Sequence, residues 1–235
     1  MGIHSFHLAV APAHVTARAL ARGGSGAARD VDGLEHLEAL SLMRLGAPAV
    51  SLERLQLRRL AVFAQWRDEG SLEAFLGSGG LGGHLASGWH VRLQFVRRWG
   101  AVTGLERLPL RVGDMEDDEP VVAVTLAHLK LPEVGRFFRW GRPVEQLVRD
   151  DPAVSLALAA IRPPGTFSTF TVWPRFTDMR AMVEGHGTGS EPRRHATAMA
   201  ENERDTFHHE FTTLRFRPLS EHGEWEGRRG IVPGL

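Results

Sequence analysis

Two stretches, Ala61-Val-Phe-Ala-Gln-Trp66 and Ser168-Thr-Phe-Thr-Val-Trp173, decide the fold of this chain of 235 residues. Both are rich in the β-branched and aromatic residues that are typical of strands. Six residues after each stretch a short apolar segment begins, at Glu73 and at Arg180. An offset of 107 residues places Trp66 on Trp173, and it also matches the phenylalanines inside both stretches. The sequence therefore predicts an internal repeat.

The segments around these stretches predict the same order of elements in each half. The second half predicts a strand at 121–129, a helix from 132 to 148, strands at 154–161 and 166–173, helices at 177–183 and 193–206, and a strand at 210–217. The first half predicts strands at 6–11, 38–45, 55–66 and 90–98, with helices near 14–21 and 72–76. The order βαββαβ is that of a split βαβ, or ferredoxin-like, unit.

Two ferredoxin-like units in tandem can bury their open sheet faces against each other. We therefore expect an α+β fold in which residues 1–105 and residues 106–235 are two tandem ferredoxin-like halves of one compact unit. Together they would form an α/β barrel of the dimeric α/β-barrel type, with a cavity between the sheets. The glycine-rich segment 77–83 predicts a flexible loop over this cavity, and the segment 103–120 predicts the linker between the halves.

The composition excludes several classes of partner and of chemistry. Lys+Arg is 28 and Asp+Glu is 28, a zero balance that argues against nucleic acid or an anionic membrane surface as the main partner. The longest apolar run, 153–161, is too short for an integral membrane segment. No basic region followed by an apolar stretch opens the sequence, so we expect no signal peptide. The chain has no cysteine, which excludes disulfides and thiolate sites and predicts a cytoplasmic location.

The counts of tyrosine, lysine and histidine limit the catalytic chemistry that the chain can carry out. Tyrosine is absent, Lys130 is the only lysine, and histidine occurs 12 times. Schiff-base chemistry would depend on Lys130 alone, and tyrosine-based chemistry is excluded.

The stretch 166–227 carries a resemblance to a known family. It contains Phe167-Ser-Thr-Phe-Thr-Val-Trp173-Pro, then His195-Ala, Leu214-Arg-Phe-Arg-Pro-Leu219 and Gly223-Glu-Trp225-Glu-Gly227. In this order the motifs resemble the C-terminal half of the spheroidene monooxygenase family. The resemblance extends over residues 121–227 and is weak before residue 90. Members of that family are understood as haem-dependent oxygenases that act on acyclic carotenoids, on an α/β barrel related to the ferredoxin-like fold.

The resemblance implies haem b as the cofactor and His195 as the axial ligand of its iron. His195 matches the family's helix histidine, although Arg194 replaces the family's alanine and an insertion lies around 187–191. Arg139, which also lies in a matched segment, would pair with a haem propionate through its guanidinium. Phe170 and Trp173 would form an apolar wall for the macrocycle, and ordinary core packing is the alternative interpretation.

His208 and His209 are the candidate catalytic residues. They are adjacent at the entry to a predicted strand, so their side chains point to opposite faces. One of them could face the cavity as a distal proton donor or as a substitute ligand. A structural role at the end of a helix is the alternative. His84, the repeat equivalent of His195, has no match in the family, and we expect it to be structural.

These observations predict a haem-dependent oxidoreductase, a monooxygenase-like biosynthetic enzyme that acts on a small apolar or amine-bearing metabolite. Haem chemistry other than oxygenation, namely dehydration or bond formation at nitrogen, stays open, because the fold does not choose the reaction. A cofactor-free oxygenase and a non-catalytic module that binds haem or another hydrophobic ligand are the remaining alternatives. An external electron donor and a homodimer are both compatible with the sequence.

Overall fold

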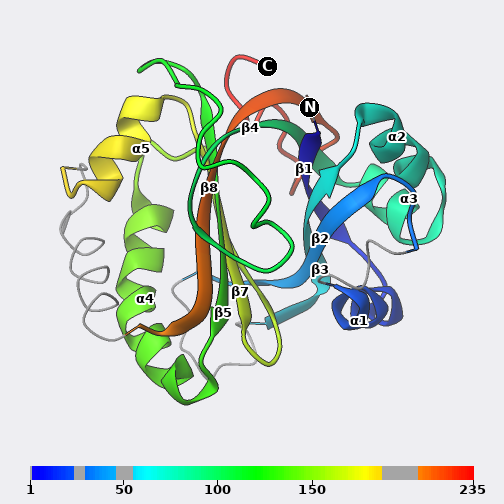
Figure 1. Ribbon diagram of the computed structural model, residues 1–235, viewed down its shortest axis with the longest axis horizontal. Coiled ribbons are helices and arrows are strands. Elements are labelled where there is room, and N and C mark those ends of the chain that lie inside the picture. Colours follow the sequence, from blue (N-terminus) through cyan, green and yellow to red (C-terminus); the bar gives the residue numbers. More distant parts are fainter. Residues whose placement is uncertain (1, 24–29, 46–54, 187–205) are drawn as a thin grey trace.

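Eight strands close into an antiparallel barrel in the computed structural model, which describes residues 2–23, 30–45, 55–186 and 206–235 (Figure 1). The strands are β1 (Ile3–Val10), β2 (Leu34–Met43), β3 (Leu55–Trp66), β4 (Trp89–Ala101), β5 (Val121–Leu129), β6 (Leu156–Arg162), β7 (Thr166–Trp173) and β8 (His208–His222). The described helices are α1 (Ala13–Arg22), α2 (Glu69–Gly77), α3 (Gly80–Ala86), α4 (Val134–Asp150), preceded by a 3-10 turn at Leu131–Glu133, and α5 (Phe176–Val183). The expected α+β class and the barrel are therefore confirmed.

The strand order around the barrel is β1-β3-β2-β6-β7-β5-β8-β4. The four strands of residues 3–101 thus stand side by side in the order β4-β1-β3-β2, and those of residues 121–222 in the order β8-β5-β7-β6. The register agrees as well, because Trp66 lies opposite Ile3 on β1 and Trp173 lies opposite Val121 on β5. Each tryptophan therefore faces the first residue of the strand that opens its half.

The inner face of the barrel is filled with apolar side chains from all eight strands. Phe170 of β7 stacks on Phe6 of β1, with ring centroids 3.6 Å apart, and Phe63 and Phe216 lie in the same cluster. Where the sequence predicts a cavity between the sheets, the described side chains pack against one another. Burial of this area is the main favourable contribution to the stability of the barrel.

The outer faces of the sheets are covered by helices (Figure 1). Helices α1, α2 and α3 lie on the side of β1, β2 and β3, where Trp66, Leu72 and Leu85 belong to one buried cluster. Helices α4 and α5 lie on the opposite side of the molecule. Phe138 of α4 and Met179 of α5 are buried there in two separate clusters.

The prediction of a flexible loop at the glycine-rich segment 77–83 is wrong, because most of this segment is helical. Residues Gly80–Ala86 form α3, where the sequence predicts a flexible loop. Leu85 is fully buried and anchors this helix on the first sheet. A Cβ at Gly82 would lie 1.9 Å from the carbonyl oxygen of Phe75, so the glycine permits close contact between α2 and α3.

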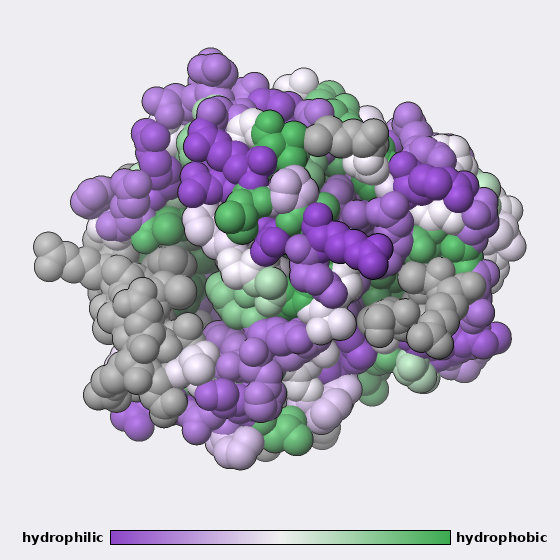
Figure 2. All heavy atoms as spheres, in the orientation of Figure 1, coloured by the Kyte–Doolittle hydropathy of each residue, from purple (hydrophilic) through white to green (hydrophobic). Residues whose placement is uncertain are grey.

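The surface has a mixed character. Figure 2 shows hydrophilic side chains over most of the face in view, with apolar side chains in smaller groups between them. None of the helices within the described residues has the length and apolar character needed to cross a membrane. The helix that the sequence predicts at 193–206, which contains His195, lies outside the described residues except for its last residue.

Candidate functional site

The outer face of the second sheet carries small side chains at its centre. Two adjacent rows cross the strands, one formed by Ala157, Thr171 and Ala123 and the next by Ala159, Thr169, Thr125 and Thr213. We call Ala123, Thr125, Ala157, Thr169, Thr171 and Thr213 the floor. All six floor residues are partly exposed, whereas the residues that alternate with them face the packed interior.

Buried apolar clusters border the floor at both ends. Trp173 and Val121 pack with Met179 of α5 at one end. Ala127 and Phe167 pack with residues of α4 at the other. The floor is thus a partly exposed surface of small side chains between two buried clusters.

The corresponding face of the first sheet lacks such a surface. Ser5, His7, Ala39, Val62 and Ala64 lie on its outer side and are all fully buried. The two halves share their strand order but differ in how their outer faces are covered. The candidate site therefore belongs to the second half.

The two equivalent tryptophans differ in their hydrogen bonds. The indole N–H of Trp66 donates to Oγ of Ser5 at 2.8 Å. Trp173 is equally buried, yet its Nε1 has no hydrogen-bond partner among the described residues. Ser5 lies two residues beyond the partner of Trp66 on β1, and the matching position on β5 is Ala123, which has no hydroxyl group. A buried donor without an acceptor costs free energy, so this N–H is a candidate contact for a bound ligand.

His208 lies on the same outer face, at the α4 end. An irregularity in the register brings His208 opposite Leu129, after His128 has paired with Glu210. Its ring is buried beside Phe137 and Phe211, and within the part of the chain that the structure describes its Nδ1 has no hydrogen-bond partner. Burial, together with the charge of Lys130, lowers the pKa of His208 to about 4. This imidazole is therefore neutral at pH 7.

The other predicted site residues are not brought together with His208. His209 is exposed, on the opposite side of the chain from His208, as adjacent strand residues should be. Arg139 is exposed on α4. Phe170 is on the inner face of the barrel, whereas Trp173, three residues later, is on the outer face. His195 lies outside the described residues.

His84, which the sequence pairs with His195, lies close to the surface of the molecule. His84 is half-buried in α3, near the end of a seven-residue helix. Its carbonyl oxygen accepts a hydrogen bond from the hydroxyl of Ser87 at 3.0 Å. The structural role expected for His84 stays a prediction.

A group of titratable side chains lies inside one end of the barrel. His4 packs against Phe63 and Phe216, and neither of its ring nitrogens has a partner. Nearby, Glu38 accepts a hydrogen bond from Arg162 at 2.6 Å, while its other oxygen is 3.7 Å from Nε2 of His36. Burial, aided by His36, lowers the pKa of His4 to about 3. Among the described residues, no three histidine, aspartate or glutamate side chains lie close enough together to hold a metal ion, here or elsewhere.

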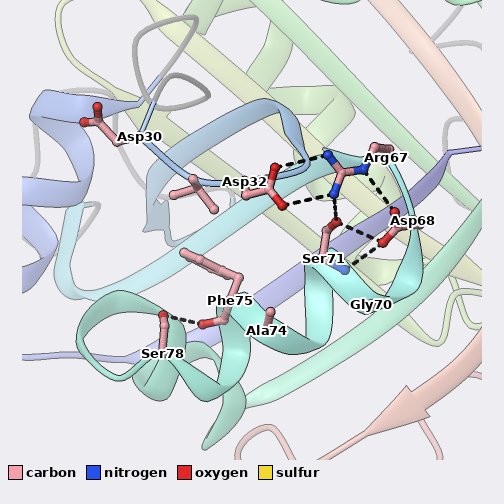
Figure 3. A pocket seen from close by; sticks show the side chains of 10 residues that line it. Asp30, Asp32, Arg67, Asp68, Gly70, Ser71, Ala74, Phe75 and Ser78 are labelled. Carbon is pink, nitrogen blue, oxygen red and sulfur yellow. Dashed lines mark hydrogen bonds and ion pairs between the residues drawn. The ribbon is translucent and has the colours of Figure 1, made fainter.

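The pocket between β3 and α2 is a structural feature. Figure 3 shows Arg67 between Asp32 and Asp68, with hydrogen bonds of 3.0 and 3.1 Å to Asp32 and one of 3.1 Å to Asp68. Asp68 also caps α2, because its Oδ1 accepts from the backbone N–H of Ser71 at 2.8 Å. These charges satisfy one another, and the pairing with Arg67 lowers the pKa of Asp32. The pocket therefore holds a helix start in place.

Comparison with known proteins places the chain near one curated enzyme. No family model matches it. Over 131 residues, 55% of the chain, it is 28% identical to the spheroidene monooxygenase of Rhodobacter capsulatus. The chain spans about half of the length of this relative, with 51% covered. The resemblance noted in the sequence is thus confirmed over a segment.

Several solved structures share a weaker likeness. An anthrone oxidase-like protein aligns over 100% of this chain and 97% of its own, with 10% identity and a TM-score of 0.35. A monooxygenase-like protein from Listeria innocua aligns over 91% and 94%, with 9% identity and a TM-score of 0.28. The heme-degrading enzyme of Listeria monocytogenes aligns over 89% and 98%, with 11% identity and a TM-score of 0.29. Scores this low do not establish a common function.

The sequence analysis missed the floor and its neighbour Arg215. The floor consists of alanine and threonine, which carry no signal of chemistry by themselves. The floor stands out only when the two sheets are compared, since Ala123 occupies the position that Ser5 occupies in the first sheet. These two residues are 118 apart in sequence, whereas the repeat in the sequence has an offset of 107. Only the pairing of the strands reveals that difference.

Proposed function

We propose that the chain is a haem-dependent, monooxygenase-like oxidoreductase whose haem b lies against the floor. The observation that carries this proposal is the buried indole N–H of Trp173, which has no acceptor beside a half-exposed surface of small side chains. The identity of 28% with a spheroidene monooxygenase over 131 residues supports the same reaction class. The substrate would be a small apolar or amine-bearing metabolite.

The proposal includes a tandem architecture, in which residues 1–105 and residues 106–235 are related ferredoxin-like halves. The matching strand orders β4-β1-β3-β2 and β8-β5-β7-β6 support it. So does the equal register of Trp66 and Trp173 against the first strand of each half. In this interpretation the first half has filled its outer face and the second has kept a site.

The residues of the second half fit a haem in three respects. Alanine and threonine side chains leave room for a flat macrocycle, and the N–H of Trp173 offers a donor to one of its carboxylates. His195 would be the residue that holds the iron, and Arg139, exposed on α4, would pair with a propionate. Phe170 faces the packed interior, on the opposite side of the sheet from the floor, so of the two expected wall residues only Trp173 would lie beside the haem. When bound, haem supplies the activation of dioxygen or peroxide.

His208 would act as the proton-handling group of this site. Because its pKa is lowered to about 4, the ring is a neutral acceptor or donor at pH 7 and not a cation. Phe137 and Phe211 hold the ring in place and exclude water from it. His209, exposed on the other face, would take no direct part unless it replaces His195 as the ligand.

Haem reconstitution of four proteins tests the proposal. Wild type should give a Soret band, and His195→Ala should lose it while the far-ultraviolet circular dichroism stays unchanged. His208→Ala should keep the band and lose turnover, and His84→Ala, the matched control from the first half, should keep both. A colourless wild type would refute the haem proposal in favour of a cofactor-free oxygenase. A six-coordinate, inactive spectrum would indicate a binding module.

A further inference from the structure

Three arginines and two aromatic rings form a stacked group beside the floor. The guanidinium carbon of Arg97 lies 4.4 Å from the ring centroid of Trp99, and that of Arg215 lies 4.6 Å from the same ring. Arg215 is also 4.6 Å from the ring of Phe176, which Arg180 approaches at 5.6 Å. Cation–π contacts of this kind orient guanidinium groups and leave their N–H edges free.

This group carries more positive charge than the protein offsets. Arg180 pairs with Asp117 at 3.4 Å. Within the described residues, Arg97 and Arg215 have their ring contacts but no carboxylate partner. Arg215 is partly buried, and this burial, together with the charges of Arg97 and Arg180, lowers its pKa to about 10. Neighbouring guanidinium groups without a counter-ion are destabilising, so an anion bound between them would be stabilised.

The next arginine on the same strand provides the contrast. Arg217 lies on the same face of β8 as Arg215, two residues further on. Its guanidinium donates to Oε2 of Glu119 at 2.9 Å and to the carbonyl oxygen of Asp114 at 3.0 Å. The charge of Arg217 is therefore neutralised by a carboxylate of the protein, whereas Arg215 has no carboxylate partner among the described residues.

The position of Arg215 connects the group to the floor. Arg215 lies opposite Ala123 in the register of β5 and β8, so it extends the floor row of Ala123 and Thr171. Phe176, which stacks on Arg215, packs against the cluster that contains Trp173. The unpaired guanidinium and the unpaired indole N–H thus lie at the same end of the floor.

We propose that Arg215, assisted by Arg97, binds a carboxylate of the ligand that lies on the floor. This inference rests on the proposed function, in which the ligand is haem b and the carboxylate a propionate. A guanidinium whose faces are covered by aromatic rings and whose edge has no acceptor matches the bidentate geometry of a carboxylate. The group thereby selects a flat ligand that is apolar over its body and anionic at one edge.

Equilibrium titrations of the full chain with three probes test this assignment. Haem b carries two carboxylates, haem dimethyl ester carries none, and 8-anilinonaphthalene-1-sulfonate is an apolar anion without iron. The variants are Arg215→Gln and Arg97→Gln, with Arg217→Gln as the matched control. Thermal unfolding of each variant verifies that it is folded.

Arg215→Gln should weaken the binding of haem b about tenfold to a hundredfold, because one charge-assisted pair is lost. The affinity for the dimethyl ester should be the same in wild type and Arg215→Gln, and Arg97→Gln should show a smaller loss for haem b. Equal affinities of wild type and Arg215→Gln for haem b would overturn the assignment while the haem proposal stood.

Other results would refute the haem proposal but leave the anion site at Arg215 intact, or would refute the anion site. If no haem bound but the sulfonate bound to wild type and failed to bind to Arg215→Gln, the haem proposal would be wrong and the anion site would stand. If Arg217→Gln weakened both anionic probes as much as Arg215→Gln, general surface charge would explain the binding, and the assignment would be wrong.

Discussion

The unequal hydrogen bonds of the two tryptophans lead to a sharp prediction. Ala123→Ser should give Trp173 the acceptor that Ser5 gives Trp66, because both positions lie two residues beyond the partner of the tryptophan. The reverse change, Ser5→Ala, should remove the acceptor of Trp66 and also the partner of Nε2 of His7 at 2.8 Å. The two substitutions should therefore shift stability in opposite directions.

The expected magnitudes follow from burial. A new internal hydrogen bond contributes about 1 kcal/mol, which is about 2–4 °C in Tm for a chain of this size. Ser5→Ala leaves two fully buried nitrogen atoms without partners, at a cost of roughly 1–3 kcal/mol each. Together these amount to about 2–6 kcal/mol, so its Tm should fall by about 4–24 °C. Ala123→Ser should also compete with the ligand for the indole N–H, and so weaken haem binding about fivefold.

Differential scanning calorimetry of the protein without haem, followed by haem titration, measures both effects. Wild type and Thr125→Ser, a change on the floor away from Trp173, serve as controls. A Tm of Ala123→Ser equal to or below that of wild type, with unchanged haem affinity, would refute the reasoning about the unpaired indole.

Two further predictions concern stability. Burial lowers the pKa of His4 to about 3 and that of His90 to about 4, below the ordinary 6.5. Between these values the unfolded chain binds protons that the native state excludes. The free energy of unfolding should therefore be highest above pH 6.5 and fall towards pH 4. His4→Leu should flatten that fall in urea unfolding between pH 7 and 4.5, and an unchanged slope would contradict this origin. Asp68→Ala removes the cap of α2 and should lower Tm by about 2–4 °C, the equivalent of about 1 kcal/mol. Its haem affinity should match that of wild type, and a loss of affinity would mean that the pocket of Figure 3 takes part in binding.

The strands could be predicted from the sequence because their patterns are local. Segments 55–66, 121–129 and 166–173 have the bounds that the structure gives to β3, β5 and β7. Alternation and β-branched residues suffice for such strands. Helix α3 could not be predicted, since its sequence is rich in glycine and its stability comes from the burial of Leu85 on the first sheet.

The candidate site was less accessible to sequence reasoning. Alternation predicts only that His208 and His209 point to opposite faces. That His208 is the buried one depends on an irregular register, which brings it opposite Leu129. Arg215 could not be distinguished from Arg217, because their difference lies in Trp99, Phe176 and Glu119, which are distant in sequence. Contacts of this kind depend on the closure of the barrel.

Haem titration of Thr169→Trp, followed by Soret absorbance, tests most directly that haem lies against the floor. Thr169 is partly exposed at the centre of the floor, so an indole there would occupy the space of the macrocycle without entering the packed interior. Leu219→Trp, at an exposed position of β8 outside the floor, is the matched control. The account predicts one haem per chain for wild type and Leu219→Trp, and no Soret band for a folded Thr169→Trp. Equal haem binding by wild type and Thr169→Trp would contradict it.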